Sequence, residues 1–250
     1  MSLLELLLLV AAGVCAGLAG SVAGLASLVK YPALLATGLA PVTANVTNTV
    51  ALVSASVGST LGSRIELEGQ GGQVRGLAMT AVAGGATGAA ILLVLPASSF
   101  EAVAPWLIAA ASLAILARGR TGKAGAAAGP PLPAAAMVPG VFLVGIYGGY
   151  FGAAAGVVLL ALLLAGRTDT LARTNALKNA VLGIANATAA LAFCLLAPVR
   201  WAAVVPLAVG LFAGGRLGPV VVRRSDAGVL RTVIGLAGLA LAAKLAVDAY

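Results

Sequence analysis

Long apolar stretches recur along the whole chain, and they restrict its fold more than any other feature. A helix needs about 20 consecutive apolar residues to cross the roughly 30 Å of hydrocarbon in a bilayer. Hydrophobic residues make up 61% of this chain and charged residues only 9%, against about 25% charged residues in soluble domains. Helices are the expected spanning elements because each satisfies its own backbone hydrogen bonds. The sequence therefore predicts an all-α, polytopic membrane protein in contact with the lipid bilayer.

Apolar blocks alternate with short segments rich in charge, proline or glycine. The blocks are 3–39, 43–62, 74–95, 105–117, 134–165, 171–197, 201–222 and 228–247. Blocks 3–39 and 134–165 are too long for one crossing, and several glycines interrupt each of them. We therefore expect both to form glycine-broken hairpins that return to the side from which they entered.

A weak internal repeat relates the two halves of the chain. A shift of 128 positions places Gly20 on Gly148 and Gly24 on Gly152. The predicted units are a first membrane repeat (1–117), a basic Gly/Pro-rich cytoplasmic loop (118–133) and a second membrane repeat (134–250). Each repeat has one hairpin and three crossing helices, so the second must be inverted relative to the first. Two inverted-topology repeats are a recurring architecture of transporters.

The charges of the loops predict the orientation. The hairpin arrangement puts these basic residues on one side: Arg64, Arg75, Arg118, Arg120, Lys123, Arg167, Arg173, Arg216, Arg223, Arg224 and Arg231. The other side receives Lys30, Arg200 and Lys244. Cytoplasmic loops carry an excess of Lys and Arg, so we expect both termini outside. The same distribution explains the net charge of +8 without a nucleic-acid partner.

Every asparagine of the chain lies in one of two segments that directly follow the hairpins. In the first segment Asn45 and Asn48 share a helical face with two serines, and in the second Asn175, Lys178 and Asn179 share a face. Amide side chains are costly in hydrocarbon unless they find partners or line a wet cavity. The predicted substrate-binding residues are Asn45, Thr47, Asn48, Asn175, Lys178 and Asn179. Hydrogen bonding between helices is the alternative role for them.

Lys178 is the one basic residue placed within a predicted helix beyond its first turn. We expect the acidic residues in loops (Glu66, Glu68, Glu101, Asp169 and Asp226) or near the termini (Glu5 and Asp248). A small anionic substrate would supply the missing counter-charge, since an unpaired ammonium is expensive inside a membrane. The alternative is that Lys178 extends to the cytoplasmic boundary of the bilayer.

The glycine-rich turns of the hairpins are a second expected source of binding groups. The glycines expected to contribute through their backbone are Gly20, Gly24, Gly148, Gly149 and Gly152. The amino ends of short helices present free N–H groups and a positive dipole end to an anion. Close packing of helices by small residues is the alternative explanation.

The sequence predicts no cofactor and no metal site, and it disfavours an enzyme. It contains no histidine, and Cys15 and Cys194 lie in apolar stretches, where we interpret them as packing residues. A nucleophile with a neighbouring base, which covalent catalysis needs, has no candidate here. A phosphate-binding GxxxxGK[ST] loop is also absent, which disfavours an ATP-driven pump.

Two segments carry a resemblance to a known family. They are GLAGSVAGLASLVKYPALLATGLAPVTANVTN (17–48) and GIYGGYFGAAAGVVLLALLLAGRTDTLARTNALKN (145–179). They resemble the paired signature regions of the sulfite exporter TauE/SafE family, although the first has GSVAGLAS where members often carry consecutive glycines. The resemblance implies a multi-pass protein of a bacterial inner (plasma) membrane. It also implies transport of small sulfur-containing or organic anions of the sulfite, sulfonate and thiosulfate class.

These observations together predict a secondary transporter or facilitator for a small anion, working by alternating access. An anion channel and a non-transporting membrane assembly protein are the alternatives. A homodimer is a candidate assembly. The sequence leaves the exact substrate, the direction of transport and any coupling ion open.

Overall fold

The described part of the chain is built from α-helices. The computed structural model describes residues 3–24, 26–120, 134–153, 155–165 and 169–224, with isolated positions between 236 and 247. Its helices are α1 (Leu3–Ala23), α2 (Ala26–Ala36), α3 (Pro41–Gly62), α4 (Arg64–Leu67), α5 (Gly71–Val94), α6 (Ala97–Arg120), α7 (Ala134–Tyr150), α8 (Ala155–Ala165), α9 (Leu171–Leu196) and α10 (Trp201–Arg224).

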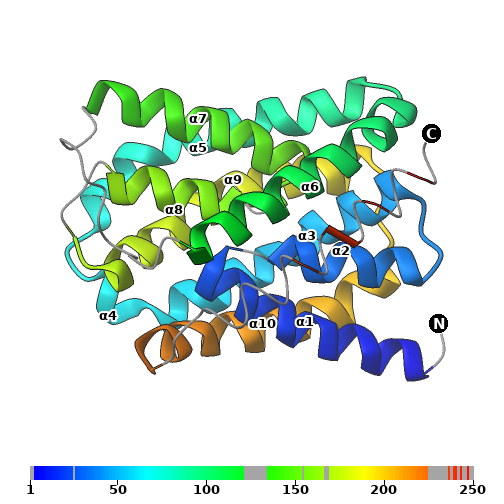
Figure 1. Cartoon of the computed structure of the whole chain (residues 1–250), viewed down its shortest axis with the longest axis horizontal. Helices are drawn as coiled ribbons and strands as arrows, with labels where there is room; N and C mark the ends of the chain where they lie inside the picture. Colours follow the sequence, from blue (N-terminus) through cyan, green and yellow to red (C-terminus); the bar gives the residue numbers. More distant parts are fainter. Residues whose placement is uncertain are drawn as a thin grey trace.

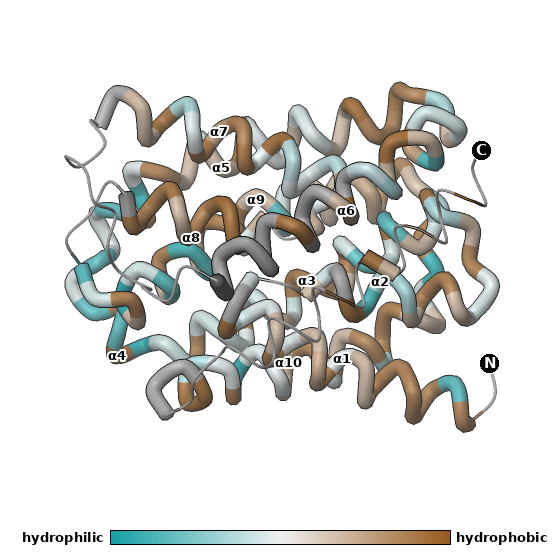
Figure 2. Tube along the Cα trace, in the orientation of Figure 1, coloured by the Kyte–Doolittle hydropathy of each residue, from teal (hydrophilic) through white to brown (hydrophobic). Residues whose placement is uncertain are grey.

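The long helices have the length and composition of membrane spans. In the described part of the chain, four segments are long and apolar enough to cross a bilayer: Leu3–Val22, Gly71–Val94, Leu171–Leu196 and Trp201–Val221. Large apolar side chains such as Leu7, Met79 and Leu195 are exposed on them, as expected of helices that face lipid. Figure 2 shows the apolar colour running along the helices. The prediction of an all-α, polytopic membrane protein is confirmed.

The helix bounds follow the predicted blocks closely, with two exceptions. α4 (Arg64–Leu67) lies in a predicted loop, so Glu66 is in a short helix rather than in a loop. α6 begins at Ala97 rather than at Pro105, so Glu101 lies inside a helix and is exposed there. The same helix continues to Arg120, which places the first residues of the predicted loop 118–133 in a helix. Residues 121–133 and the predicted block 228–247, apart from isolated positions, lie outside the described residues.

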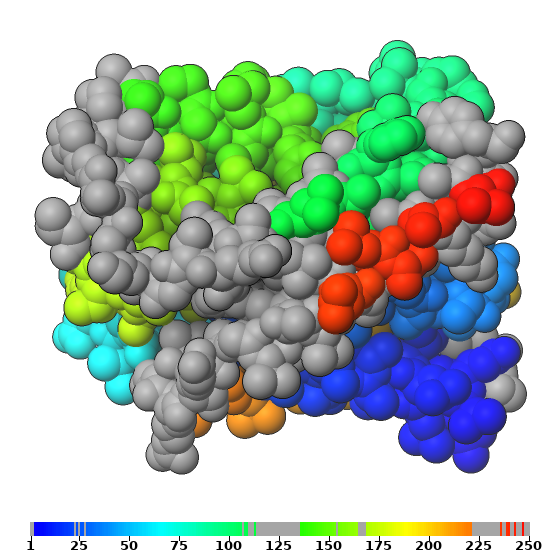
Figure 3. Space-filling model, in the orientation of Figure 1, coloured from blue at the N-terminus to red at the C-terminus, as the bar shows by residue number. Residues whose placement is uncertain are grey.

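The long helices lie roughly side by side along the longest axis of the molecule (Figure 1). α1 packs against α10 at one edge, and α5 packs against α7 at the opposite edge. Figure 3 shows these edges in blue and orange and in teal and green. α3 and α9 lie between the edges and contact each other. Their polar residues are therefore held inside the bundle.

Glycines bring the paired helices into backbone contact. A Cβ atom added at Gly13 would lie 2.6 Å from the Leu207 carbonyl oxygen of α10, and one at Gly88 would lie 2.1 Å from the Ile146 carbonyl oxygen of α7. Small residues allow this close approach, from which membrane helices gain van der Waals contact. Close packing thus explains many of the glycines of the long helices, as the alternative prediction stated.

Both long blocks break at a glycine with positive φ. The break between α1 and α2 is at Gly24 (φ 76°), and the break between α7 and α8 includes Gly152 (φ 72°). Glycine adopts this conformation without the steric penalty that other residues incur. In Figure 1 the α1–α2 hairpin opens toward the end that carries the amino terminus, and the α7–α8 hairpin opens toward the end that carries α4. The two hairpin tips therefore meet inside the bundle.

Candidate functional site

A small cavity lies where the two hairpin tips meet. Its volume is about 40 Å³, roughly three times the ~10–15 Å³ that one water needs. Its walls come from the first hairpin (Gly20, Ser21, Gly24, Ala26, Ser27), the second hairpin (Gly152, Gly156), α3 (Leu52, Ala55, Ser56, Ser59) and α9 (Asn179, Leu182, Asn186). We call this space the central cavity.

The hairpin tips touch through their backbones beside the central cavity. A Cβ atom on Gly24 would lie 2.4 Å from the Gly156 carbonyl carbon, and a Cβ on Gly156 would lie 2.6 Å from the Gly24 Cα. Real Cβ atoms do not approach other heavy atoms this closely, so both positions require glycine. The contact joins the two halves of the chain at the wall of the cavity.

The two short helices begin at this junction. The first residues of α2, Ala26 and Ser27, and the second residue of α8, Gly156, line the central cavity. Each of these helices has 11 residues. The first N–H groups of a helix have no partner within it, and the amino end carries partial positive charge. Both helices therefore direct positive electrostatic potential at the cavity.

The polar face of α9 binds the tip of the first hairpin. Asn175 Nδ2 and Asn179 Nδ2 donate to the Ser21 carbonyl oxygen, at 2.9 and 3.3 Å. Lys178 Nζ donates to the Gly20 carbonyl oxygen at 3.3 Å and is fully buried. Three of the predicted site residues are thus brought together, and they belong to the half of the chain opposite the hairpin that they contact.

The predicted residues of α3 separate into different contacts. Asn45 Nδ2 donates to the Tyr150 carbonyl oxygen of the second hairpin at 2.8 Å, and Asn48 Nδ2 donates to Ser27 Oγ at 3.4 Å. Thr47 Oγ1 accepts from the Arg200 backbone N–H, just before α10, so it holds a loop. The six predicted residues do not form one cluster, and of them Asn179 lines the central cavity.

Lys30 is a second buried lysine, which the sequence argument placed at the outer side of the membrane. It lies in α2, one turn beyond the hairpin tip, is fully buried, and donates from Nζ to the Asn48 carbonyl oxygen at 3.3 Å. The prediction that Lys178 alone is a basic residue deep in a helix is therefore wrong. The cause is the unequal length of the two helices of the hairpin. The second helix, α2, is short and starts at Ala26 near the hairpin tip, so a residue near its start lies deep in the bundle.

The five predicted glycines also divide by role. Gly20, Gly24 and Gly152 line the central cavity. Gly148 lies beside it, since an added Cβ would meet Leu182 and Asn186 of the cavity wall at 3.3 and 3.8 Å. Gly149 instead packs against Gly85 of α5, where an added Cβ would be 2.4 Å from a carbonyl oxygen. Gly149 thus serves helix packing.

Several polar atoms at the tips have no hydrogen-bond partner within the described part of the chain. They are Ser21 Oγ, Asn45 Oδ1, Asn48 Oδ1 and Asn175 Oδ1, all buried. Buried polar groups without partners are rare, and each one calls for an explanation such as a water or a ligand. Ser21 and Ser27 were missed as site residues because nothing in their sequence context separates them from other small residues of a hairpin.

A second and larger cavity lies nearer the end of the bundle that carries the amino terminus. Its volume is about 240 Å³, and its lining includes Val42, Leu92, Pro96, Phe100, Tyr150 and Pro198. Aromatic rings connect its lining to the second hairpin tip: Phe100 contacts Tyr150 and Phe151, and Phe151 contacts Tyr31 in an edge-on pair at 5.3 Å. We call this space the outer cavity and these four rings the aromatic cluster.

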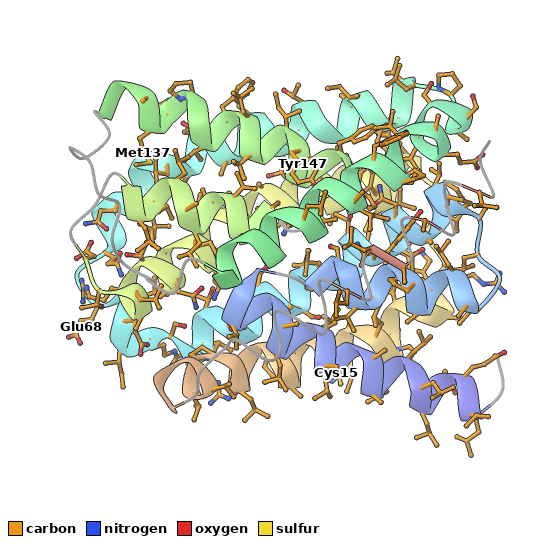
Figure 4. The ribbon with its side chains drawn as sticks, in the orientation of Figure 1. Cys15, Glu68, Met137 and Tyr147 are labelled. Carbon is orange, nitrogen blue, oxygen red and sulfur yellow. The ribbon has the colours of Figure 1, made fainter. Side chains whose placement is uncertain are left out.

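Neither cysteine belongs to the site. Cys15 and Cys194 are exposed on the helices, and Figure 4 shows Cys15 on α1 at the edge of the molecule. Their interpretation as packing residues is wrong, since both lie on surfaces that face the surroundings of the bundle. Among the described residues, no three His, Cys, Asp or Glu side chains are grouped so that they could hold a metal ion.

Spanning helices, two broken hairpins and polar groups buried at their junction define a polytopic membrane transporter. The chain belongs to the sulfite exporter TauE/SafE family, whose model matches residues 9–245. It is 29% identical over 237 residues to the probable membrane transporter protein YfcA of Escherichia coli strain K12, covering 94% of this chain and 87% of that protein. YfcA from Escherichia coli O157:H7 matches to the same extent. No solved structure matches this chain.

The family confirms the resemblance of the two signature segments and the assignment of the chain as a transporter rather than an enzyme. The chain is thus a multi-pass membrane protein of a transporter family.

Proposed function

We propose that this protein is a secondary transporter or facilitator that moves a small sulfur-containing or organic anion across the inner membrane by alternating access. The candidate substrates are of the sulfite, sulfonate and thiosulfate class. The observation that carries the proposal is Lys178, whose amino group is fully buried and donates to the Gly20 carbonyl oxygen in the wall of the central cavity.

The Lys178 side chain lacks a counter-ion among the described residues. Within the described residues, no carboxylate forms an ion pair with Lys178, and its hydrogen bond goes to a neutral carbonyl group. Burying an unpaired charge costs several kcal/mol, and a charged residue inside a membrane is a functional-site candidate by default. An anion in the central cavity would offset this cost.

The surroundings of the cavity favour the same sign of ligand. The amino ends of α2 and α8 point their positive dipole ends at it. Asn179 and Asn186 supply amide groups to the wall, and Ser27, Ser56 and Ser59 supply hydroxyl groups. The Ser56 and Ser59 hydroxyl groups donate to backbone carbonyl oxygens of α3. The Ser27 hydroxyl and the amides of Asn179 and Asn186 are the wall groups that would donate to an oxyanion. The residues proposed to bind the anion are therefore Lys178, Asn179 and the hairpin backbone, with Asn175 positioning the tip.

An inverted repeat is part of the proposal, and the helix bounds support it. A shift of 128 carries α3 from 41–62 to 169–190, near α9, and α2 from 26–36 to 154–164, near α8. The helix contacts exchange in the same way: α1 packs on α10 as α7 packs on α5, and α2 packs on α3 as α8 packs on α9. The hairpins open at opposite ends of the bundle (Figure 1).

Alternating access is supported by the position of the aromatic cluster. Gly152 lines the central cavity, its neighbour Phe151 belongs to the cluster, and Phe100 and Tyr150 line the outer cavity. The cluster contains residues of both hairpins, Tyr31 from the first and Phe151 from the second. We propose that a movement of one hairpin against the other shifts these rings and connects the two cavities. An anion channel, the alternative mechanism, would need a continuous path through the bundle.

The proposed orientation places the α4 end in the cytoplasm and the amino terminus outside. Arg64 in α4, Arg75 in α5 and Arg173 in α9 lie at the α4 end. Glu68 lies there as well (Figure 4), and its carbonyl oxygen accepts from Arg173. Arg200 lies at the other end, between α9 and α10. An excess of basic residues marks cytoplasmic loops. A homodimer stays a prediction.

The test is flux of radiolabelled sulfite, thiosulfate and sulfoacetate into proteoliposomes that contain the purified protein. We expect saturable flux that an internal excess of the same anion accelerates by exchange, which a carrier shows and a channel does not. Lys178→Met should abolish it. Flux that does not saturate would favour the channel. No flux of any tested anion from folded protein would favour the assembly protein.

A further inference from the structure

Lys30 is the feature that the proposed transport mechanism does not use. Its side chain is fully buried, and its recorded hydrogen bond goes to the Asn48 carbonyl oxygen at 3.3 Å. Within the described residues, no carboxylate forms an ion pair with it. An ammonium has three N–H donors, so two remain for a ligand or for water. Lys30 is therefore as uncompensated as Lys178.

Lys30, like Lys178, lies behind the wall of the central cavity and does not line it. Lys30 is linked to the cavity wall through Asn48, whose amide donates to Ser27 Oγ, and Ser27 lines the cavity. Lys178 is linked to the wall through the Gly20 carbonyl oxygen. The two lysines come from α2 and α9, in different halves of the chain. Both therefore lie beside the tip of the first hairpin.

Unpartnered oxygen atoms accompany both lysines. Asn48 Oδ1 lies on the side chain next to Lys30, Asn175 Oδ1 lies one helical turn from Lys178, and Ser21 Oγ belongs to the tip between them. All three atoms are buried. The two amide oxygens are acceptors that water or a lysine N–H group would satisfy, whereas the Ser21 hydroxyl can also donate. The three atoms indicate a polar space beside the two lysines.

The charge balance of this region favours an anion with two negative charges. If both buried lysines are protonated when a ligand binds, they repel each other, and a single negative charge would neutralise only one of them. A doubly charged oxyanion would neutralise both. We infer that Lys30 is a second cationic residue of the substrate site, and that the pair Lys30 and Lys178 selects doubly charged oxyanions over singly charged ones. This inference rests on the proposed anion transport.

The test compares two probes that share an SO₃ group and differ in charge, thiosulfate with two negative charges and methanesulfonate with one. Binding of each to the purified protein is measured by isothermal titration, and flux is measured in proteoliposomes. We expect the wild type to bind thiosulfate at least about tenfold more tightly than methanesulfonate. This comparison needs no variant, so it decides the inference even if substitutions impair folding.

Substitutions at Lys30 then assign the selectivity to this residue. Lys30→Met should weaken thiosulfate binding by about tenfold to a hundredfold, since it removes one partner of a buried charge pair, and should change methanesulfonate binding by less than about threefold. Lys30→Arg keeps the charge and should retain most of the preference. Arg200→Met, at an exposed basic residue outside the site, is the matched control and should change neither value.

The outcomes separate this inference from the proposed function. Equal binding of both probes by the wild type, or equal weakening of both by Lys30→Met, would overturn the role of Lys30 and leave anion transport standing. Absence of both binding and flux for every anion tested would overturn the proposed function and the inference with it. A thiosulfate preference that is lost in Lys30→Met and kept in Lys30→Arg and Arg200→Met would support both.

Discussion

The two hairpins have the same backbone plan and very different side chains. Each has a long arm, a break that includes a glycine with positive φ, and an 11-residue short arm. The first short arm carries Lys30, and the corresponding position of the second, at a shift of 128, is Val158. Conversely, Lys178 in α9 corresponds to Val50 in α3. The two halves thus place one buried cation each, at positions that the repeat does not relate.

This difference makes the site one-sided. Lys178, Asn175 and Asn179 all donate to carbonyl oxygens of the first tip, and Lys30 lies within the first hairpin itself. The second tip receives one such bond, from Asn45 to the Tyr150 carbonyl oxygen. In the proposed repeat the two hairpins would share a common scaffold, and the first hairpin tip would be the part of it adapted for charge.

The largest expected effect comes from a side chain placed between the two tips. Gly24→Val should prevent folding for two reasons. It forces a β-branched residue into the positive-φ conformation of Gly24, and it places a Cβ only 2.4 Å from the Gly156 carbonyl carbon. Together these cost about 2–5 kcal/mol of folding free energy. Gly38→Ala is the control: its φ is also positive, at 79°, but no atom lies within 4 Å of the added Cβ. Expression and gel-filtration profiles in detergent would check the pair. Normal folding of Gly24→Val would refute the contact between the tips.

The second effect concerns the cation on α9. Lys178→Met should abolish anion flux while thermal stability stays equal or rises, because replacing a buried charge by an apolar side chain of similar size is often neutral or stabilising. Adding Val50→Lys moves the cation to the repeat-related position and should not restore flux. Restored flux in the double variant would show that the two tips are interchangeable, against the asymmetry described above.

A smaller effect is expected from the amides that bind the tips. Asn179→Ala removes both a cavity-lining group and a bond to the Ser21 carbonyl oxygen, so the concentration for half-maximal flux should rise about fivefold to tenfold, as for roughly 1 kcal/mol. Asn45→Ala removes the corresponding bond to the second tip and should change this value by less than about twofold. Concentration dependence of flux measures both. An equal rise of the half-maximal concentration in the two variants would mean that both hairpin tips contribute equally to binding.

The smallest expected effect is on stability, when one tyrosine of each hairpin is replaced by phenylalanine. Tyr31 in the first has a buried hydroxyl group without a partner among the described residues, whereas Tyr147 in the second donates to the Ala153 carbonyl oxygen. Tyr31→Phe should therefore leave stability unchanged or slightly raised, and Tyr147→Phe should lower it by about 1 kcal/mol. Thermal unfolding in detergent would show the order, and a reversed order would contradict these hydrogen-bond assignments.

Much of this architecture could be predicted from the sequence. Apolar runs predicted the helices, because hydrocarbon thickness fixes their length. The glycines of the two long blocks predicted a break in each, and the structure places these breaks at Gly24 and Gly152. Lys30 could not be placed, since the depth of a residue in a hairpin depends on the unequal lengths of its arms. Thr47 resembled its asparagine neighbours in sequence, but its hydroxyl accepts from the Arg200 N–H. Such pairings between distant segments are set by tertiary packing.

The central claim is that the anion binds in the central cavity at the first hairpin tip. The most direct measurement is an experimental structure of the purified protein with and without thiosulfate, at a concentration that saturates flux. We predict added density between Ser21, Ser27 and Asn179, within reach of the Lys178 ammonium group. Density in the outer cavity alone, or no added density while flux is saturated, would contradict the account.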